Sequence, residues 1–225
     1  MGVSCVHSLT IPSGKSGQQV IESINKRLES FGAQKCGQFS VDSDTYYSVN
    51  QMTGQTPEGS DSTVTTPGGQ TSRVLNVFHC SEYPMSCFGL LDTGTSLVAD
   101  STFDLILLNL SANYSNKKMN RIEVRGQKWS LHDFCVRIGS CSLGPSLKGV
   151  LLEIEYKPSV VANHCWDLIK ELAQSLCGSG ISVANQWMAS RMNEMYSPMD
   201  TIKQYNYHFN QLRKANTSNT QTIIK

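Results

Sequence analysis

The chain of 225 residues carries 19 Lys and Arg against 18 Asp and Glu, which gives a formal net charge of +1. This balance argues against direct nucleic-acid binding, because such binders usually show a basic face and a high pI. The longest apolar run, Leu105–Leu108, is far too short to span a bilayer, so we expect no membrane partner.

Eight cysteines occur without a CxxC pair, and the first residues, MGVSCVHS, lack the apolar region of a signal peptide. A secreted disulfide scaffold is therefore not expected. We interpret the cysteines as reduced thiols in a nuclear or cytosolic protein. They are Cys5, Cys36, Cys80, Cys87, Cys135, Cys141, Cys165 and Cys177.

The N-terminal segment predicts a strand, a helix and a second strand. Alternation over Val3–Leu9 indicates the first strand. Ser16 then begins a helix, and Gln19 three residues later completes a capping box. Gly32 ends this helix, and Gln38–Val41 resembles the second strand. The apolar stripe of the helix consists of Val20, Ile21, Ile24, Leu28 and Phe31.

Residues 50–72 consist almost entirely of Gly, Pro, Ser, Thr and Gln. Such a segment buries too little apolar area to offset its chain entropy, so we predict a disordered surface insertion. The first 50 residues alone offer too little core for a domain. The insertion therefore interrupts one domain and does not separate two.

Three short strands are expected after the insertion, at Val74–His79, Pro84–Leu91 and Thr95–Ala99. Asp92–Gly94 between the last two is a hairpin turn. Residues Ser101–Leu110 fit either a helix or a strand, and the cap-like serine favours the helix.

The second half predicts three more strands and a helix. The strands are Arg121–Arg125, His132–Ile138 and Val150–Tyr156, and the last has Glu153 and Glu155 opposite its apolar face. The helix spans Ala162–Cys177, with apolar residues at helical spacing. Residues 178–196 look irregular, with a short amphipathic turn around Trp187.

The last predicted helix has clear local signals. Ser197 is its N-cap, Pro198 its first residue and Asp200 its third. Its apolar stripe is too regular for a solvated tail, so we expect the stripe to pack within the chain. We expect one domain over residues 1–215 and a flexible tail over 216–225. The stripe consists of Ile202, Tyr205, Phe209 and Leu212.

About eight antiparallel strands and a few helices indicate an α+β barrel or sandwich. LLDTGTSL at Leu90–Leu97 also resembles the catalytic segment of an aspartic protease. That chemistry needs two carboxylates about 3 Å apart that share a proton. The chain has one DTG, so only a homodimer using Asp92 of each copy would serve. We favour a plain hairpin turn, and the homodimeric protease is the alternative.

Gly14-Lys15-Ser16 lies between a strand and a helix, like the end of a phosphate-binding P-loop. The first glycine of that motif would fall on Leu9, where the backbone must curl around a phosphate. The antiparallel strands downstream also do not suit a P-loop sheet. Nucleotide binding is therefore a distant third hypothesis.

Two groups of His and Cys residues lack the spacing of zinc ligands, and free cysteine usually packs as a small hydrophobe. We assign no catalytic, metal-binding or cofactor-binding residue, and we expect a protein that is not an enzyme. The two groups are His79, Cys80 and Cys87, and His132, Cys135 and Cys141.

Several segments in order resemble the Mediator complex subunit 20 family. They include SEYPMSCF at Ser81–Phe88 and the closing PMDTIKQY and FNQLRK. They also include MGVSCV, GKSGQQ, DFCVRIGS, GPSLKG, EIEY and VVANHCWDL, together with Ile122-Glu123-x-Arg125-Gly126. Residues 50–72 and 178–196 depart from the family pattern.

The resemblance implies an antiparallel β-barrel of about eight strands with flanking helices. It also implies a structural role without catalysis, in the head module of the nuclear Mediator complex. The implied partners are Mediator subunit 18 in a heterodimer, the C-terminal region of subunit 8 and other head-module subunits. Through these contacts the family would act as a coregulator of RNA polymerase II.

Overall fold

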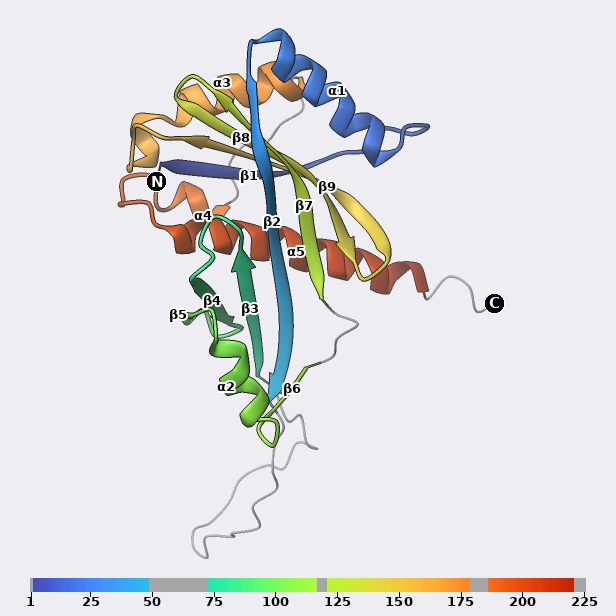
Figure 1. Cartoon of the computed structure of the whole chain (residues 1–225), viewed down its shortest axis with the longest axis vertical. Helices are drawn as coiled ribbons and strands as arrows, with labels where there is room; N and C mark the ends of the chain where they lie inside the picture. Colours follow the sequence, from blue (N-terminus) through green and yellow to red (C-terminus); the bar gives the residue numbers. More distant parts are fainter. Residues whose placement is uncertain (1, 49–72, 117–120, 179–185, 221–225) are drawn as a thin grey trace, which may run out of the picture.

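The computed structural model of the chain describes residues 2–48, 73–116, 121–178 and 186–220 (Figure 1). The insertion expected at 50–72 lies outside these residues and stays a prediction. Within the described residues, none of the helices combines the length and apolarity that crossing a bilayer requires.

The described strands form one antiparallel sheet of nine strands, in the order β1-β9-β8-β7-β2-β3-β4-β5, with β6 beside β2. Strand β2 is the longest and runs through the centre of Figure 1. The strands are β1 (Val3–Leu9), β2 (Gln34–Ser48), β3 (Val74–Cys80), β4 (Ser86–Leu91), β5 (Ser96–Asp100), β6 (Tyr114–Asn116), β7 (Ile122–Leu131), β8 (Phe134–Leu143) and β9 (Ser146–Tyr156).

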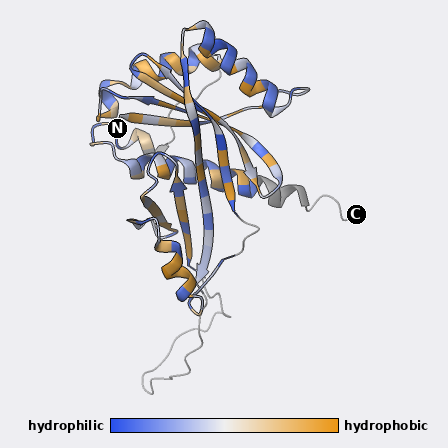
Figure 2. Cartoon of the chain, viewed as in Figure 1, coloured by the Kyte–Doolittle hydropathy of each residue, from blue (hydrophilic) through white to orange (hydrophobic). Residues whose placement is uncertain are grey.

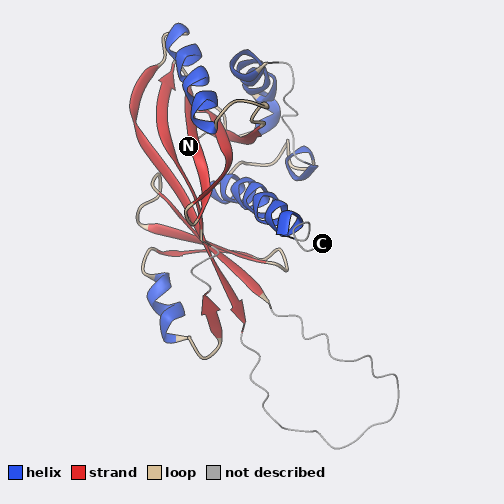
Figure 3. Ribbon diagram, turned by 90° about the vertical axis from the view of Figure 1, so that its right-hand side faces the viewer, coloured by secondary structure: helices blue, strands red, loops and turns tan. Residues whose placement is uncertain are grey.

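Helices cover both faces of the sheet. Helices α1 and α3 pack on one face of β1, β8 and β9, and α5 packs on the other (Figure 3). Helix α2 covers the far end of the sheet, over β3 and β4. The helices are α1 (Gly17–Ser30), α2 (Phe103–Asn109), α3 (Trp166–Cys177), α4 (Gln186–Ala189) and α5 (Pro198–Thr220), and a 3-10 turn spans Ala162–His164.

Strand β9 is buried on both faces, which explains its continuous run of buried residues. Leu152 and Ile154 belong to the cluster under α1 and α3, whereas Leu151 belongs to the cluster under α5. The polar residues that alternate with the apolar ones are therefore enclosed as well. Glu153 and Glu155 face α5 and are 5% and 8% exposed.

The α+β class and the antiparallel sheet are confirmed, and the geometry of the barrel differs in one respect. The strand path has two ends, β1 and β5, and no ladder joins them within the described residues. Helix α5 lies in this gap and packs against both β1 and β4. A helix therefore takes the place where a closed barrel would pair its end strands.

The apolar stripe of α5 packs within the chain, as predicted. Ile202, Tyr205 and Phe209 are each at most 1% exposed, and Leu212 contacts the same cluster. The helix ends at Thr220, inside the segment 216–225 that the sequence analysis assigns to a flexible tail. The division into a domain and a flexible tail stays a prediction.

Several boundaries also differ from those predicted. Strand β2 begins at Gln34 and ends at Ser48, because its pairing with β7 and β3 extends over polar residues that carry no apolar pattern. Strand β6 was not predicted, since three polar residues pair there with the end of β2. Residues 162–164 form a 3-10 turn, so α3 begins only at Trp166.

The entry of α1 follows its sequence signal. The Ser16 hydroxyl accepts the Gln19 backbone N–H, and the Gln19 side chain accepts the Ser16 backbone N–H at 2.8 Å. These two bonds satisfy donors that the first turn of a helix leaves without partners.

Replacing this cap should have a small and local cost. We expect Ser16→Ala to lower the free energy of unfolding by about 1 kcal/mol, measured by chemical denaturation. Ser13→Ala, in the exposed turn before the helix, is the control and should change stability by less than about 0.5 kcal/mol. Equal values for the two variants would contradict the role of the cap.

Candidate functional site

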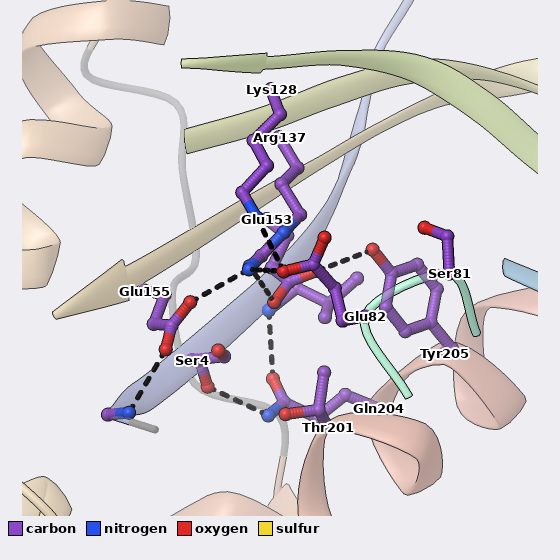
Figure 4. A network of polar contacts seen from close by, with 12 residues as sticks. Ser4, Ser81, Glu82, Lys128, Arg137, Glu153, Glu155, Thr201, Gln204 and Tyr205 are labelled. Atoms are coloured by element: carbon purple, nitrogen blue, oxygen red, sulfur yellow. Dashed lines mark hydrogen bonds and ion pairs between the residues drawn. The ribbon is translucent and has the colours of Figure 1, made fainter. Parts of the chain in front are cut away.

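Among the described residues, the most densely connected polar group lies where α5, the sheet and the β3–β4 turn meet (Figure 4). We call it the charge network and define it as Glu82, Lys128, Arg137, Glu153 and Glu155. Strand β8 supplies the arginine and β9 two of the carboxylates, because paired antiparallel strands place Arg137 opposite Glu153. The β3–β4 turn supplies Glu82.

Arg137 is the centre of the charge network and is 5% exposed. Its Nη1 atom donates to Glu153 Oε1 at 2.7 Å, and its Nη2 atom donates to Glu155 Oε2 at 2.9 Å. The same Nη2 atom also donates to Glu82 Oε2 at 2.8 Å. A planar guanidinium with several donors is suited to such multiple contacts, and an ammonium group is not.

Glu82 ties the β3–β4 turn to the sheet. Besides Arg137, it accepts a hydrogen bond from Lys128 Nζ of β7 at 2.6 Å. Burial alone would raise the pKa of Glu82, but these two cations outweigh burial and hold the pKa below its usual value. Burial likewise opposes the lowered pKa of Glu155, which Arg137 and the backbone N–H of Gly2 produce.

Helix α5 joins the charge network through Tyr205. The phenol donates to Glu153 Oε2 at 2.7 Å, while the ring packs in the apolar cluster under the helix. Burial, with Glu153 beside it, raises the pKa of Tyr205 well above its usual value. The phenol therefore keeps its proton and acts as a fixed donor.

A second set of contacts joins α5 to the outer edge of β1. Gln204 accepts the Val6 backbone N–H at 2.9 Å and donates to the Ser4 carbonyl at 2.9 Å. His208 Nε2 lies 2.9 Å from the Val6 carbonyl, which can only accept, so that nitrogen carries the proton. Side chains of α5 thus satisfy backbone groups that a neighbouring strand would otherwise pair.

A cavity of about 200 Å³ borders the charge network. Its lining combines Arg137 and the network carboxylates with Cys80, Tyr83 and Ile202. Burial raises the pKa of the Cys80 thiol to about 12, which keeps it protonated and unreactive. The groups at this site bind one another, so the arrangement is suited to fastening α5 and the β3–β4 turn to the sheet.

The DTG segment forms the predicted hairpin turn between β4 and β5. Gly94 has φ +90°, and its N–H donates to the Leu91 carbonyl at 3.0 Å. The Asp92 carboxylate is exposed and accepts the Val74 backbone N–H at 3.2 Å. Asp92 therefore holds the turn against the start of β3.

Asp92→Asn tests this structural assignment. The amide oxygen of Asn can accept the same backbone N–H, and Asn tolerates turn conformations. We expect the free energy of unfolding to change by less than about 0.5 kcal/mol. Denaturation curves measure stability, and a peptide library incubated at acidic pH measures cleavage. Pepstatin-sensitive cleavage that disappears in the variant would contradict the assignment.

The Gly14-Lys15-Ser16 segment does not form a P-loop. Its serine is used in the capping box of α1, and the sheet beside it is antiparallel. In the first His and Cys group, His79 of β3 is paired with Cys87 of β4. His79 lies 3.2 Å from Asp104 and 3.8 Å from Asp42, and the described residues contain no cluster suited to a metal ion.

None of the eight cysteines forms a disulfide in the described structure. Burial raises the pKa of the Cys5 thiol to about 12, with Glu153 adding to the shift, and burial raises that of Cys141 to about 12. These thiols are protonated near neutral pH and pack as small apolar groups.

Comparison with known proteins assigns the family. The family described as "TATA-binding related factor (TRF) of subunit 20 of Mediator complex" matches residues 1–210. The chain belongs to the Mediator subunit 20 family. The resemblance that the sequence segments indicated is thereby confirmed.

Relatives in this family are similar to the chain over nearly its whole length. "Mediator of RNA polymerase II transcription subunit 20" of Gallus gallus is 40% identical over 214 residues, and that of Homo sapiens is 39% identical. In both cases the match covers 95% of each chain. The Drosophila melanogaster protein is 34% identical and covers 95% of this chain and 87% of its own.

The sequence interpretation missed the charge network. Glu153 and Glu155 alternate with apolar residues, which is also the pattern of a strand with one solvated face. One signal was present, since the SEYPMSCF segment that carries Glu82 and Tyr83 was singled out for its resemblance to the family. Its role as a turn that reaches the centre of the sheet depends on the fold.

Proposed function

We propose that the chain is a non-enzymatic structural subunit of the Mediator head module. In this role it acts in the nucleus as a coregulator of RNA polymerase II through contacts between proteins. The observation that carries the proposal is the family match over residues 1–210, with relatives that align along 95% of the chain. The polar groups at the most connected site support it, because they are engaged with one another.

We further propose Mediator subunit 18 as the direct partner in a heterodimer, with the C-terminal region of subunit 8 nearby. This assignment rests on the sequence resemblance, and the net charge of +1 does not favour direct DNA binding as an alternative. Such a protein would reach DNA only through the complex that it joins. Contacts with other head-module subunits complete the proposed set.

The homodimeric protease is not favoured by any observation. Its carboxylate, Asp92, already accepts a backbone hydrogen bond at the tip of an exposed hairpin. A catalytic dyad would need two such carboxylates to share one proton in an enclosed site.

The test is affinity purification of the tagged full-length chain from nuclei, followed by quantitative mass spectrometry. We expect subunits 18 and 8 and other head-module subunits to be enriched. Their enrichment should stay the same after nuclease treatment, because the contacts are between proteins. The Asp92→Asn variant is the matched control and should recover the same set. Recovery of the chain without Mediator subunits would contradict the proposal. Recovery of Mediator without direct contact to subunit 18 would contradict only the heterodimer.

A further inference from the structure

The outer surface of α2 is apolar and exposed. The exposed apolar residues here are Leu105, Ile106 and Leu108, with Leu110 directly after the helix, whereas Val98 of β5 is exposed on the opposite face of the sheet. Val98, Leu105 and Leu108 are 62%, 59% and 63% exposed. Figure 2 shows α2 as a mostly hydrophobic helix at the end of the molecule away from α1. Exposed apolar side chains that gather on one short helix are suited to contact with a partner.

The backbone of β5 is open along the same edge. In the ladder with β4, Ser101 N–H donates to the Met85 carbonyl, and hydrogen-bonded pairs recur at every second residue. This alternation directs the backbone groups of Leu97 and Ala99 toward β4. It directs those of Ser96 and Val98 outward.

The two edge strands of the sheet differ in what occupies their outward backbone groups. At β1, side chains of α5 occupy the outward backbone groups, as Gln204 does for Ser4 and Val6. At β5, no described strand or helix occupies the outward groups of Ser96 and Val98. Exposed edges of this kind are places where another chain can add a strand.

The charge of this region selects the chemistry of the partner. Residues 81–116 contain Glu82, Asp92, Asp100 and Asp104 but no Lys or Arg. Glu82 is engaged in the charge network, and the Asp104 carboxylate of α2 lies 3.2 Å from His79 Nε2. Asp92 and Asp100 lie at the two ends of β5 and carry the remaining negative charge. A second copy of the chain would bring the same negative charges to the contact. A segment with Lys or Arg beside its apolar residues complements them.

We propose that a segment of another Mediator subunit, apolar and carrying Lys or Arg, adds to β5 as a further antiparallel strand and covers α2. The inference rests on the proposed role as a Mediator subunit. Ala99 belongs to the cluster that Leu107 of α2 caps, so one face of the added strand would contact α2. Val98 is paired with Phe88 and points to the opposite face, where the strand's other side chains would lie.

A substitution that removes a backbone hydrogen-bond donor of β5 distinguishes binding by strand addition from binding by apolar side-chain contact alone. Val98→Pro removes one outward N–H but leaves the hydrogen bonds to β4, because proline is accepted on edge strands when its nitrogen faces solvent. We expect this variant to melt close to wild type and to recover the contacting Mediator subunit about tenfold less in purification of the full-length chain. Leu168→Glu, at an exposed apolar position of α3, is the control and should recover it fully.

A pair of substitutions at one position tests the charge. Ile106→Lys and Ile106→Glu remove the same exposed apolar side chain and differ in sign. We expect Ile106→Lys to weaken recovery more, since it repels the proposed basic segment. Equal recovery from both variants, or a stronger loss with Ile106→Glu, would overturn the proposed chemistry.

The contact itself is identified by a photoreactive residue at position 98 of the full-length chain within purified Mediator. We expect a cross-link to an apolar segment with Lys or Arg in another Mediator subunit. If Mediator subunits co-purify but position 98 links to a second copy, to an acidic segment or to nothing, the inference fails and the proposed function stands. If wild type recovers no Mediator subunit, both fail.

Discussion

Arg137→Ala should destabilise the protein by about 3–5 kcal/mol, because it leaves buried carboxylates without their cation. Glu153 and Glu155 are both more than nine-tenths buried and bind the same guanidinium. Urea denaturation followed by circular dichroism measures the change. We also expect the β3–β4 turn to lose protection from hydrogen exchange, since Glu82 is released from the sheet.

Two other substitutions define what the charge network requires. Arg125→Ala removes an arginine of β7 whose side chain is 69% exposed and pairs with Glu123. An exposed ion pair contributes at most about 1 kcal/mol, so this control should have a small effect. Arg137→Lys keeps the charge but lacks the guanidinium fork, and we expect an intermediate loss. A loss for Arg137→Ala as small as that for Arg125→Ala would contradict the role of the charge network.

The pH dependence of the Arg137→Ala effect has a defined sign. In the fold the pKa values of Glu82 and Glu155 are lowered from 4.5. A lowered pKa contributes stability that is present above the unfolded value and is lost as pH falls through the folded value. Without Arg137, burial raises the pKa values of these carboxyl groups. Protonation then removes the buried negative charge that destabilises the variant. The difference between wild type and Arg137→Ala should therefore narrow from neutral pH to about pH 4.

The sequence alone predicts those parts of the fold whose signal lies within a few adjacent residues. The capping box of Ser16 and Gln19, the hairpin at Asp92–Gly94 and the stripe of α5 each occupy a few adjacent residues. Their structure follows from hydrogen bonds and periodicities within that window. The SEYPMSCF and closing segments likewise indicate the family without reference to the fold.

The rest depends on contacts that no local pattern encodes. In the sequence, Glu153 has the pattern of a solvated residue. It is buried because α5 packs over it, and its partner on α5, Tyr205, lies 52 positions further along the chain. The ends of β2 are polar, and their pairing is set by β7 and β3. The expected barrel of about eight strands did not specify how its ends meet, because strand count alone does not reveal that α5 fills the gap between β1 and β4.

The closing helix gives the second large expected effect. Phe209 is fully buried and stacks on Phe78 of β3 with ring centroids 6.0 Å apart. We expect Phe209→Ala to cost about 3–5 kcal/mol through lost burial and the cavity left behind. For a chain of this length, that corresponds to a melting temperature lower by about 6–20 °C.

The same helix supplies the control, because Tyr207 is 48% exposed and Tyr207→Ala should change stability by less than about 1 kcal/mol. Thermal melts of the isolated full-length chain measure both variants. If α5 is part of the core, Phe209→Ala weakens the isolated protein, and any loss of Mediator subunits follows from unfolding. If instead Phe209→Ala melts like wild type and still fails to recover subunit 18, α5 serves chiefly as an interface. The helix would then not be what holds the two ends of the sheet together.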